Sequence, residues 1–320
     1  MNSGWEKLMS ISKNSKIYVA GHRGLVGSAI VRRLNIGGYT NIIGRTHHEL
    51  DLLDQQETNN FFEQEKPEYV FLAAAKVGGI YANNTYPAEF IYENLLVQNN
   101  VINAAHQVGV KWFCFLGSSC IYPRDCPQPI KEEYFLTGLL EKTNRPYAIA
   151  KIMGIQLCAA FNALQGTRFV SVMPTNLYGP NDNYDLANSH VLPALLRKAH
   201  EAKIHNATEF VVWGTGNPKR EFLYVDDMAD ACVFLLEKQI NAGVYNIGCG
   251  TDVTIKQLAE TIVSVVGFTG KLIFDTTKPD GTPQKLLDVS SLEALGWTAS
   301  TSLRDGIART YKDFVSGDFV

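Results

Sequence analysis

The sequence predicts an α/β protein with a doubly wound parallel sheet and a smaller C-terminal α/β lobe. Short apolar segments alternate with helical patterns over the first 175 residues, as in successive βαβ units. The first apolar segment ends in a glycine-rich turn, Gly21 to Gly27, that leads directly into a helix pattern. The 320 residues are enough for one large domain or two modest ones. Together these features are typical of a Rossmann-type sheet.

The expected elements follow one another in βαβ order. Strands are expected at residues 16–20, 41–44, 69–74, 111–116 and 169–173, and helices at about 25–34, at 92–108 and around Tyr147. The rhythm changes after residue 174, because residues 175–220 are rich in Asn, Pro and Gly, with one helix near 191–202. A strand at 222–225 and an apolar helix to residue 236 indicate a return to the first domain. Residues 254–314 are expected to form a helix, a strand at 271–274 and a terminal helix.

Composition argues against several classes of function. A formal net charge of −3 gives no broad basic surface for nucleic acid or an anionic membrane. We expect no membrane span, and the polar first fifteen residues lack a signal-peptide core. The six cysteines form no CxxC pair, so we expect core thiols in a reducing, cytoplasmic setting. No cluster of His, Cys and Asp has the spacing of metal ligands, so no metal is expected.

The glycine turn is a dinucleotide-binding pattern. Gly21, Gly24 and Gly27 allow the backbone to approach a pyrophosphate closely, and the following helix directs its N-terminus at the phosphates. The alternative is a glycine-rich turn that binds no ligand. With a strand before it and a helix after it, the pattern favours a cofactor site.

The end of the second strand indicates which cofactor is bound. NAD-binding sheets place Asp or Glu there to bind the ribose hydroxyls, whereas this chain has Gly44, Arg45 and Thr46. Arg23 and Arg45 can instead bind a 2′-phosphate with two hydrogen bonds each, which favours NADP(H) over NAD(H). The alternative for Arg45 is an ordinary solvated charge. Asp51 can accept a hydrogen bond from the adenine amino group, or it can cap a turn.

Tyr147 and Lys151 are the candidate proton-transfer pair. They are four residues apart, so they lie one turn apart on the same face of a helix. We expect the ammonium to lower the pKa of the phenol, which then exchanges a proton with a carbonyl oxygen during hydride transfer. A surface Tyr beside a surface Lys is the alternative. Ser118, with Ser119 as its rival, ends the fourth strand, where ligands bind in parallel sheets.

These residues resemble the extended short-chain dehydrogenase/reductase family. Longer segments narrow the resemblance to members that act on GDP-4-keto-6-deoxymannose. These segments are AGHRGLVGSAI (20–30), GSSCIYP (117–123), EKTNRPYAIAKIMGIQLC (141–158), SVMPTNLYGPND (171–182), NSHVLPALLRK (188–198), REFLYVDDMA (220–229) and KPDGTPQKLLDV (278–289). The resemblance extends from about residue 16 to the C-terminus.

The resemblance implies two reactions in one pocket. The first is epimerisation at C3″ and C5″ of the sugar, whose protons are acidic because both carbons flank the C4″ ketone. The resemblance assigns these proton transfers to Cys120 and His190. Without it, Cys120 would be interpreted as a buried thiol and His190 as a loop histidine. The second reaction is reduction of C4″ by NADPH, with Tyr147 as proton donor, giving GDP-L-fucose.

The resemblance also implies binding residues. Substrate contacts are expected from Asn176, Lys198, Trp213, Arg220, Asp280 and Lys285. Cofactor contacts are expected from Gly21, Arg23, Gly24, Leu25, Val26, Gly27, Arg45, Asp51, Leu52, Lys151, Pro174, Asn176, Leu177 and His190. Two positions depart from the family. Lys198 stands where Arg is frequent and keeps the charge, whereas His47 replaces a second Arg of the 2′-phosphate site and weakens the expected selectivity for NADP(H).

The domain assignment follows from these sites. Residues 1–15 are expected to be a flexible leader, 16–175 with about 222–253 the NADP-binding domain, and 176–221 with 254–320 the GDP-sugar-binding lobe. A homodimer is expected through the helices from Tyr92 and around Tyr147, with Ile149, Ile152, Ile155 and Gln156 near the interface. The alternatives are a C4 reductase of a related GDP-4-keto sugar such as a heptose, and a non-catalytic NADP sensor, which the intact Ser, Tyr and Lys disfavour.

Overall fold

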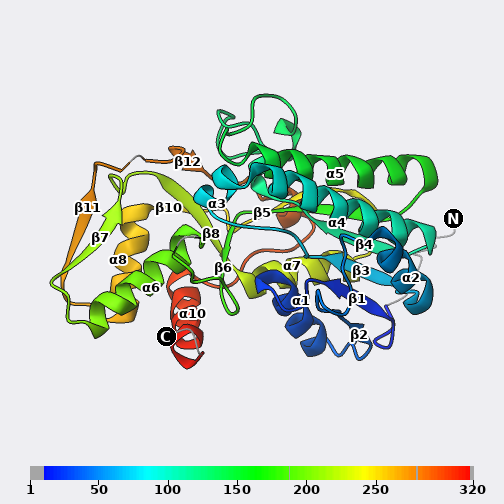
Figure 1. The fold of residues 1–320 in the computed structure, drawn as a ribbon, viewed down its shortest axis with the longest axis horizontal. Coiled ribbons are helices and arrows are strands. Elements are labelled where there is room, and N and C mark those ends of the chain that lie inside the picture. The colour runs from blue at the N-terminus through cyan, green and yellow to red at the C-terminus, as the bar shows by residue number, and fades with distance from the viewer. Residues whose placement is uncertain (1–10, 187, 279, 318–320) are drawn as a thin grey trace, which may run out of the picture.

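A six-stranded parallel sheet forms the larger lobe of the protein (Figure 1). The computed structural model describes residues 11–186, 188–278 and 280–317. The strands run in the order β2-β1-β3-β4-β5-β9, and every neighbouring pair is parallel. They are β1 (Ile17–Ala20), β2 (Ile42–Ile43), β3 (Tyr69–Leu72), β4 (Trp112–Leu116), β5 (Phe169–Pro174) and β9 (Gly243–Ile247). The predicted doubly wound sheet is confirmed.

Helices cover both faces of this sheet. Ile17 and Val19 of β1 pack on one face with α1 (Leu25–Ile36) and α7 (Val225–Glu237). Tyr18 and Ala20 point to the other face and pack with α2 (Gln55–Glu65), α4 (Pro87–Gln107) and α5 (Arg145–Gln165). The strands are mostly apolar because side chains alternate between two buried faces, with Ser171 of β5 and Asn246 of β9 as polar exceptions. The short helix α3 (Ile80–Thr85) precedes α4.

The smaller lobe is built around two short sheets. In the first, β8 (Lys219–Tyr224) pairs with β6 (Asn176–Tyr178), β10 (Asp252–Thr254) and β12 (Gln284–Lys285). In the second, β7 (Glu209–Trp213) pairs with β11 (Lys271–Asp275). Helices α6 (Val191–Ile204), α8 (Ile255–Val266) and α10 (Leu303–Ser316) close a separate core against these strands. This lobe lies at the left of Figure 1, next to α3 and β5.

The chain crosses between the lobes more than once. Residues 222–224 belong to β8 and pair with β6, and Leu223 already joins the core of the larger lobe together with Val225, the first residue of α7. The segment that contains α9 (Ser290–Ala294) also packs on the larger lobe, where Leu292 and Trp297 join its core. The Trp297 indole donates a hydrogen bond of 2.8 Å to Asp230 of α7. Short strands of similar composition do not reveal which sheet they join.

Two further expectations need correction. Residues 11–15 are not a frayed leader, since Ile11 is buried and the Lys13 carbonyl accepts a hydrogen bond from the backbone of Thr40; residues 1–10 lie outside the described residues. Helix α5 is long and apolar enough to cross a membrane by length and composition, contrary to the expectation for the chain. In the fold it packs on α4 and β5 and carries the buried Lys151.

Glu221 of β8 joins the two lobes. Its side chain is fully buried, at 0% exposure. One carboxylate oxygen accepts the N–H groups of Cys249 at 2.7 Å and Gly250 at 2.8 Å, just after β9, and the other accepts that of Leu287 at 3.0 Å, just after β12. Neighbouring strand residues face opposite ways, so this anchor fixes the direction of Arg220. Arg220 in turn is in register with Lys285 of β12.

Candidate active site

Tyr147 and Lys151 lie in the first two turns of α5, at the edge where the sheet meets the smaller lobe. Pro146 in the first turn suits a helix start, because the first N–H groups have no partner within the helix. Lys151 is 3% exposed, and its Nζ donates a hydrogen bond of 2.7 Å to the carbonyl of Leu116, the last residue of β4. The same Nζ lies 5.7 Å from the centre of the Tyr147 ring. The helix therefore brings the predicted pair together.

Burial sets the protonation of this pair. The surrounding protein raises the pKa of Tyr147, and a negative charge on Cys120 would raise it further. It lowers the pKa of Lys151 to about 8, also through burial. The expected lowering of the Tyr147 pKa is therefore not found in this structure, because burial disfavours the charged phenolate. At neutral pH the phenol keeps its proton.

Ser118 and Cys120 follow the end of β4. Ser118 has an extended backbone, and its Oγ accepts a hydrogen bond of 3.3 Å from the backbone N–H of Cys120 in the 3₁₀ turn Ser119–Ile121. Cys120 and Ser119 are buried, whereas Ser118 is partly exposed. Burial raises the pKa of the Cys120 thiol, and the positive charges of Lys285 and Lys151 and a hydrogen bond with Ser118 oppose that rise.

His190 and Lys285 come from the smaller lobe. His190 is the residue before α6, with its side chain at the N-terminal end of that helix. His190 is exposed by its surface area, but the protein atoms around it still desolvate the imidazolium form and lower its pKa, and the positive charge of Lys285 lowers it further. The pKa of Lys285 is lowered by burial, while a charge on Cys120 would raise it. Lys285 thus interacts electrostatically with both proposed epimerisation groups, and Cys120 interacts with Tyr147 and Lys151.

The glycine turn forms a cradle that side chains would fill. Gly21 has a φ of +79°, and a Cβ at this position would lie 2.7 Å from the backbone nitrogen of Ala74. A Cβ at Gly27 would lie 2.1 Å from the Gly21 carbonyl oxygen. Gly24 is the N-cap of α1 and supplies no capping side chain, so the first N–H groups of Leu25 and Val26 remain available. These features fit a pyrophosphate at the N-terminus of the helix.

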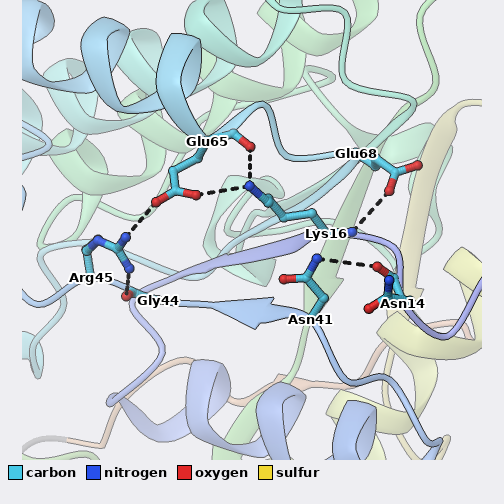
Figure 2. Close-up of polar contacts among 7 residues, drawn as sticks. All are labelled: Asn14, Lys16, Asn41, Gly44, Arg45, Glu65 and Glu68. Carbon is cyan, nitrogen blue, oxygen red and sulfur yellow. Dashed lines mark hydrogen bonds and ion pairs between the residues drawn. The ribbon is translucent and has the colours of Figure 1, made fainter.

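Arg45 is engaged by the protein itself (Figure 2). One of its terminal nitrogens donates a hydrogen bond of 2.7 Å to Glu65 at the end of α2, and the other donates one of 2.9 Å to the Gly44 carbonyl. Glu65 also accepts from the Nζ of Lys16, which enters β1. Arg23 is exposed in the glycine turn. The two arginines lie near each other, since both influence the pKa of Glu49 and of His22.

The other expected cofactor residues lie in the segments that follow β2 and β5. Asp51 accepts a hydrogen bond of 2.9 Å from the Leu53 N–H, so it caps a turn, and His47 lies 3.5 Å from its carboxylate. Leu52 packs on the core of the larger lobe. Pro174 ends β5, and Leu177 of β6 packs against the core of the larger lobe. The Asn176 amide donates a hydrogen bond of 2.8 Å to the Glu221 carbonyl.

The expected GDP contacts form a second group in the smaller lobe. The Trp213 ring is 64% exposed, with the Nζ of Lys198 at 4.9 Å from its centre and that of Lys278 at 5.5 Å. Both carboxylate oxygens of Asp280 are already hydrogen-bonded, one to the backbone N–H and the other to the hydroxyl of Thr215. Arg220 donates a hydrogen bond of 2.6 Å to the Thr282 carbonyl. The segment around Asp280 is therefore tied down beside Trp213.

Sequence reasoning missed several residues of the site. His22 occupies the space beside Gly44, and Lys278 flanks Trp213. Glu221 anchors the strand of Arg220, although a Glu in a strand pattern usually marks a solvent face. The signal for His22 was its place between two glycines of the cofactor turn. No local signal pointed to Glu221, whose partners are distant in sequence.

Comparisons with known proteins agree with this geometry. Residues 17–248 match the model of the NAD dependent epimerase/dehydratase family. The chain therefore belongs to that family of dinucleotide-dependent enzymes. Among its relatives, GDP-L-fucose synthase 1 of Arabidopsis thaliana is 62% identical over 299 residues, which cover 93% of this chain and 93% of that protein. The resemblance found in the sequence is confirmed.

Solved structures share the whole fold. A GDP-6-OMe-4-keto-L-xylo-heptose reductase from C. jejuni superposes with a TM-score of 0.90 at 38% identity, covering 96% of this chain and 99% of that one. A GDP-L-fucose synthetase from Naegleria fowleri bound to NADP superposes with a TM-score of 0.87 at 31% identity, covering 96% and 94%. The two-lobed arrangement is thus common to proteins that handle GDP-linked sugars.

Proposed function

We propose that this enzyme converts GDP-4-keto-6-deoxy-D-mannose to GDP-L-fucose, by epimerisation at C3″ and C5″ followed by NADPH-dependent reduction at C4″. The proposal rests on one observation: the groups suited to carbonyl reduction and those suited to proton exchange interact electrostatically in one site. Ser118, Tyr147 and Lys151 suit a carbonyl reduction, and Cys120 with Lys285 and His190 suits proton exchange. The names of the curated relatives, such as the Arabidopsis GDP-L-fucose synthase, support the same substrate.

Tyr147 donates the proton in the reduction. Its raised pKa keeps the phenol protonated at neutral pH, so a proton is available for the developing alkoxide at C4″. Ser118 holds the C4″ oxygen with its hydroxyl, and Lys151 places a positive charge beside the phenol as it loses its proton. When bound, NADPH supplies the hydride. The hydrogen bond of Lys151 to Leu116 keeps the ammonium in place between β4 and α5.

Cys120 and His190 carry out the epimerisations. The C4″ ketone acidifies the protons on its two neighbouring carbons, so a base on one face and an acid on the other invert each centre. The two residues come from different lobes, which allows them to reach opposite faces of a sugar bound between β4 and α6. Burial raises the Cys120 pKa, which Lys285 opposes, and both burial and Lys285 lower the His190 pKa, so the thiol suits the acid and the neutral imidazole the base.

The larger lobe binds NADPH and the smaller lobe binds the GDP moiety. The cradle from Gly21 to Gly27 accepts the pyrophosphate, and Arg23 and Arg45 attract the 2′-phosphate. The remaining cofactor contacts lie at the ends of β2, β5 and β6. Trp213 offers a face for the guanine ring, with Lys198 and Arg220 directed at the diphosphate. The solved relative bound to NADP supports this cofactor.

The enzyme acts as a homodimer in the cytoplasm. Helices α4 and α5 present an apolar outer face with Tyr92 at 64%, Met153 at 51% and Ile149 at 36% exposure. Paired with a second copy, this face forms a four-helix bundle, which accounts for the unusual hydropathy of α5. Ile155, in contrast, is buried in the core and cannot contribute. The six cysteines, all in the described part of the chain, are free thiols, which supports a reducing compartment.

Product identification tests the proposal. The purified protein is incubated with GDP-4-keto-6-deoxymannose and NADPH in heavy water, and the sugar is analysed by NMR. GDP-L-fucose with deuterium at C3″ and C5″ is the expected product. A product reduced at C4″ without inversion would indicate a reductase alone. Conversion only of a GDP-4-keto heptose would favour the activity named for the C. jejuni structure.

A further inference from the structure

Gly44, at the end of β2, has no room for a side chain. A Cβ at this position would lie 2.4 Å from Cγ, 2.6 Å from Nδ1 and 2.8 Å from Cδ2 of His22, and real Cβ atoms do not approach other atoms within 3.0 Å. The backbone itself does not require glycine, since Gly44 is not among the glycines with positive φ. Position 44 is therefore restricted by the imidazole of His22 and not by its own conformation.

The His22 ring is held in this place. It belongs to the glycine turn between β1 and α1, and its Nδ1 is buried without a hydrogen-bond partner within the part of the chain that the structure describes. Burial lowers the pKa of His22, and the charges of Arg23 and Arg45 act in the same direction, while the charge of Glu49 and a hydrogen bond with the Arg45 backbone oppose them. At neutral pH the ring is uncharged. It therefore packs as a neutral group between the glycine turn and the end of β2.

Position 44 is also where cofactor choice is made in such sheets. Gly44 lies about 20 residues beyond the glycine turn, which is the distance at which NAD-binding proteins place the Asp or Glu that binds the ribose hydroxyls. Arg45 does not account for selectivity by itself, because its guanidinium is already held by Glu65, which it shares with Lys16, and by the Gly44 carbonyl (Figure 2). The exclusion of an acidic side chain from position 44 is therefore an effect separate from the charges of Arg23 and Arg45.

We propose that His22 determines the cofactor specificity of this enzyme: its ring occupies the space that an acidic side chain at position 44 needs, and so keeps the end of β2 open to the 2′-phosphate of NADPH. The inference rests on the proposed use of NADPH. It assigns His22 a steric role at the cofactor's ribose, separate from the charge of Arg23 and Arg45.

Four variants test the steric relation and its chemical consequence. Gly44→Ala and Gly44→Asp should each lower the unfolding temperature by roughly 3–10 °C, the cost of overpacking one site. Adding His22→Ala to either should restore much of that loss. The readouts are thermal unfolding and the dissociation constants of NADPH and NADH, measured by nicotinamide fluorescence without any sugar substrate.

The double variant with Asp at position 44 gives the decisive comparison. Relative to H22A/G44A, H22A/G44D should bind NADH about tenfold more tightly and NADPH about tenfold more weakly, a loss of discrimination of roughly two orders of magnitude. H22A/G44A has the same space without the carboxylate and should show no gain for NADH.

Two results would overturn the inference. One is a Gly44→Asp variant that folds normally and gains NADH affinity with His22 in place. The other is a stability loss in Gly44→Ala that His22→Ala does not relieve, which is measurable even if an Asp variant fails to fold. Because these readouts use no sugar substrate, a failure here is distinguishable from a failure of the proposed reaction, which the product analysis of the unaltered enzyme decides.

Discussion

The Nζ atom of Lys151 lies 5.7 Å from the centre of the Tyr147 ring, one turn further along α5, and donates its hydrogen bond to the Leu116 carbonyl. The ammonium is thus anchored to the end of β4 while remaining beside the phenol. Its pKa of about 8 means that most of it is protonated at neutral pH. This arrangement holds a charge next to a group that loses its proton only during the reaction.

Tyr147→Phe removes that proton donor and little else. We expect at least a 100-fold loss in the rate of C4″ reduction, the usual scale of general acid catalysis, with NADPH affinity unchanged. Single-turnover absorbance of NADPH measures the reduction, and fluorescence titration measures the binding. Tyr92→Phe is the matched control, because Tyr92 is exposed on α4. Substantial reduction by Tyr147→Phe would place the proton donor elsewhere.

Lys285→Met should shift the pH dependence of epimerisation. The Lys285 charge lowers the pKa of both Cys120 and His190, so its removal raises both values. The pH at which proton exchange rises should therefore move upward. Lys278→Met, beside Trp213, is the control and should leave the profile in place. An unchanged profile in Lys285→Met would remove Lys285 from the epimerisation site.

Asp182→Asn should stabilise the protein at alkaline pH. Burial raises the Asp182 pKa to about 7, and one of its oxygens has no hydrogen-bond partner among the described residues. A raised folded-state pKa means that stability is full below about pH 4 and declines as the pH rises through 7. Asn keeps the oxygen that accepts from Asn183 and cannot ionise. We expect a gain of roughly 1–3 kcal/mol in unfolding free energy at pH 8.

The pH dependence of the stability gained by Asp182→Asn serves as an internal control. The advantage of Asp182→Asn should shrink steadily toward pH 4 in denaturant titrations. Asp125→Asn, at an exposed position, should show no such trend. A gain that is equal at pH 5 and pH 8 would mean that ionisation of Asp182 does not limit stability.

Charged residues on the outer face of α5 should break the proposed dimer. Ile149→Glu combined with Met153→Glu places two carboxylates in a face that would otherwise be buried, where unpaired charges are costly. Light scattering at micromolar concentration should then report a monomer, and the unaltered protein a dimer. Ile36→Glu, on α1 at the opposite face of the sheet, should leave the dimer intact. A monomeric unaltered protein would contradict the proposal.

Local patterns were enough to predict the parallel sheet and the helix of Tyr147. Those elements have strong apolar periodicity and clear glycine signals, which act over a few residues. Strand β9 escaped prediction, because its buried Asn246 interrupts the apolar pattern and is satisfied by Tyr122, Ile130 and Asp288, far away in sequence. The same reason hid Glu221. The raised pKa of Tyr147 also depends on burial, which helix spacing cannot reveal.

The grouping of Lys285 with Cys120 and His190 was likewise out of reach. The sequence resemblance placed Lys285 among the GDP contacts, as part of one motif with Asp280. Residues on either side of Gly281 go to different places, however: Asp280 binds Thr215, and Lys285 is in register with Arg220 near Cys120. Only the pairing of β12 with β8 decides which part of the motif reaches the reacting sugar.

Cys120→Ser in heavy water tests the central claim most directly, namely that separate groups perform epimerisation and reduction in one pocket. A hydroxyl is a much poorer proton-transfer group than a thiol at neutral pH. We predict at least an approximately 100-fold slower deuterium incorporation at C3″ and C5″, while C4″ reduction of the unepimerised ketone continues, giving a GDP-deoxyhexose other than fucose. His190→Gln should also slow exchange, and Cys126→Ser is the matched control. Normal exchange in both Cys120→Ser and His190→Gln would contradict the account.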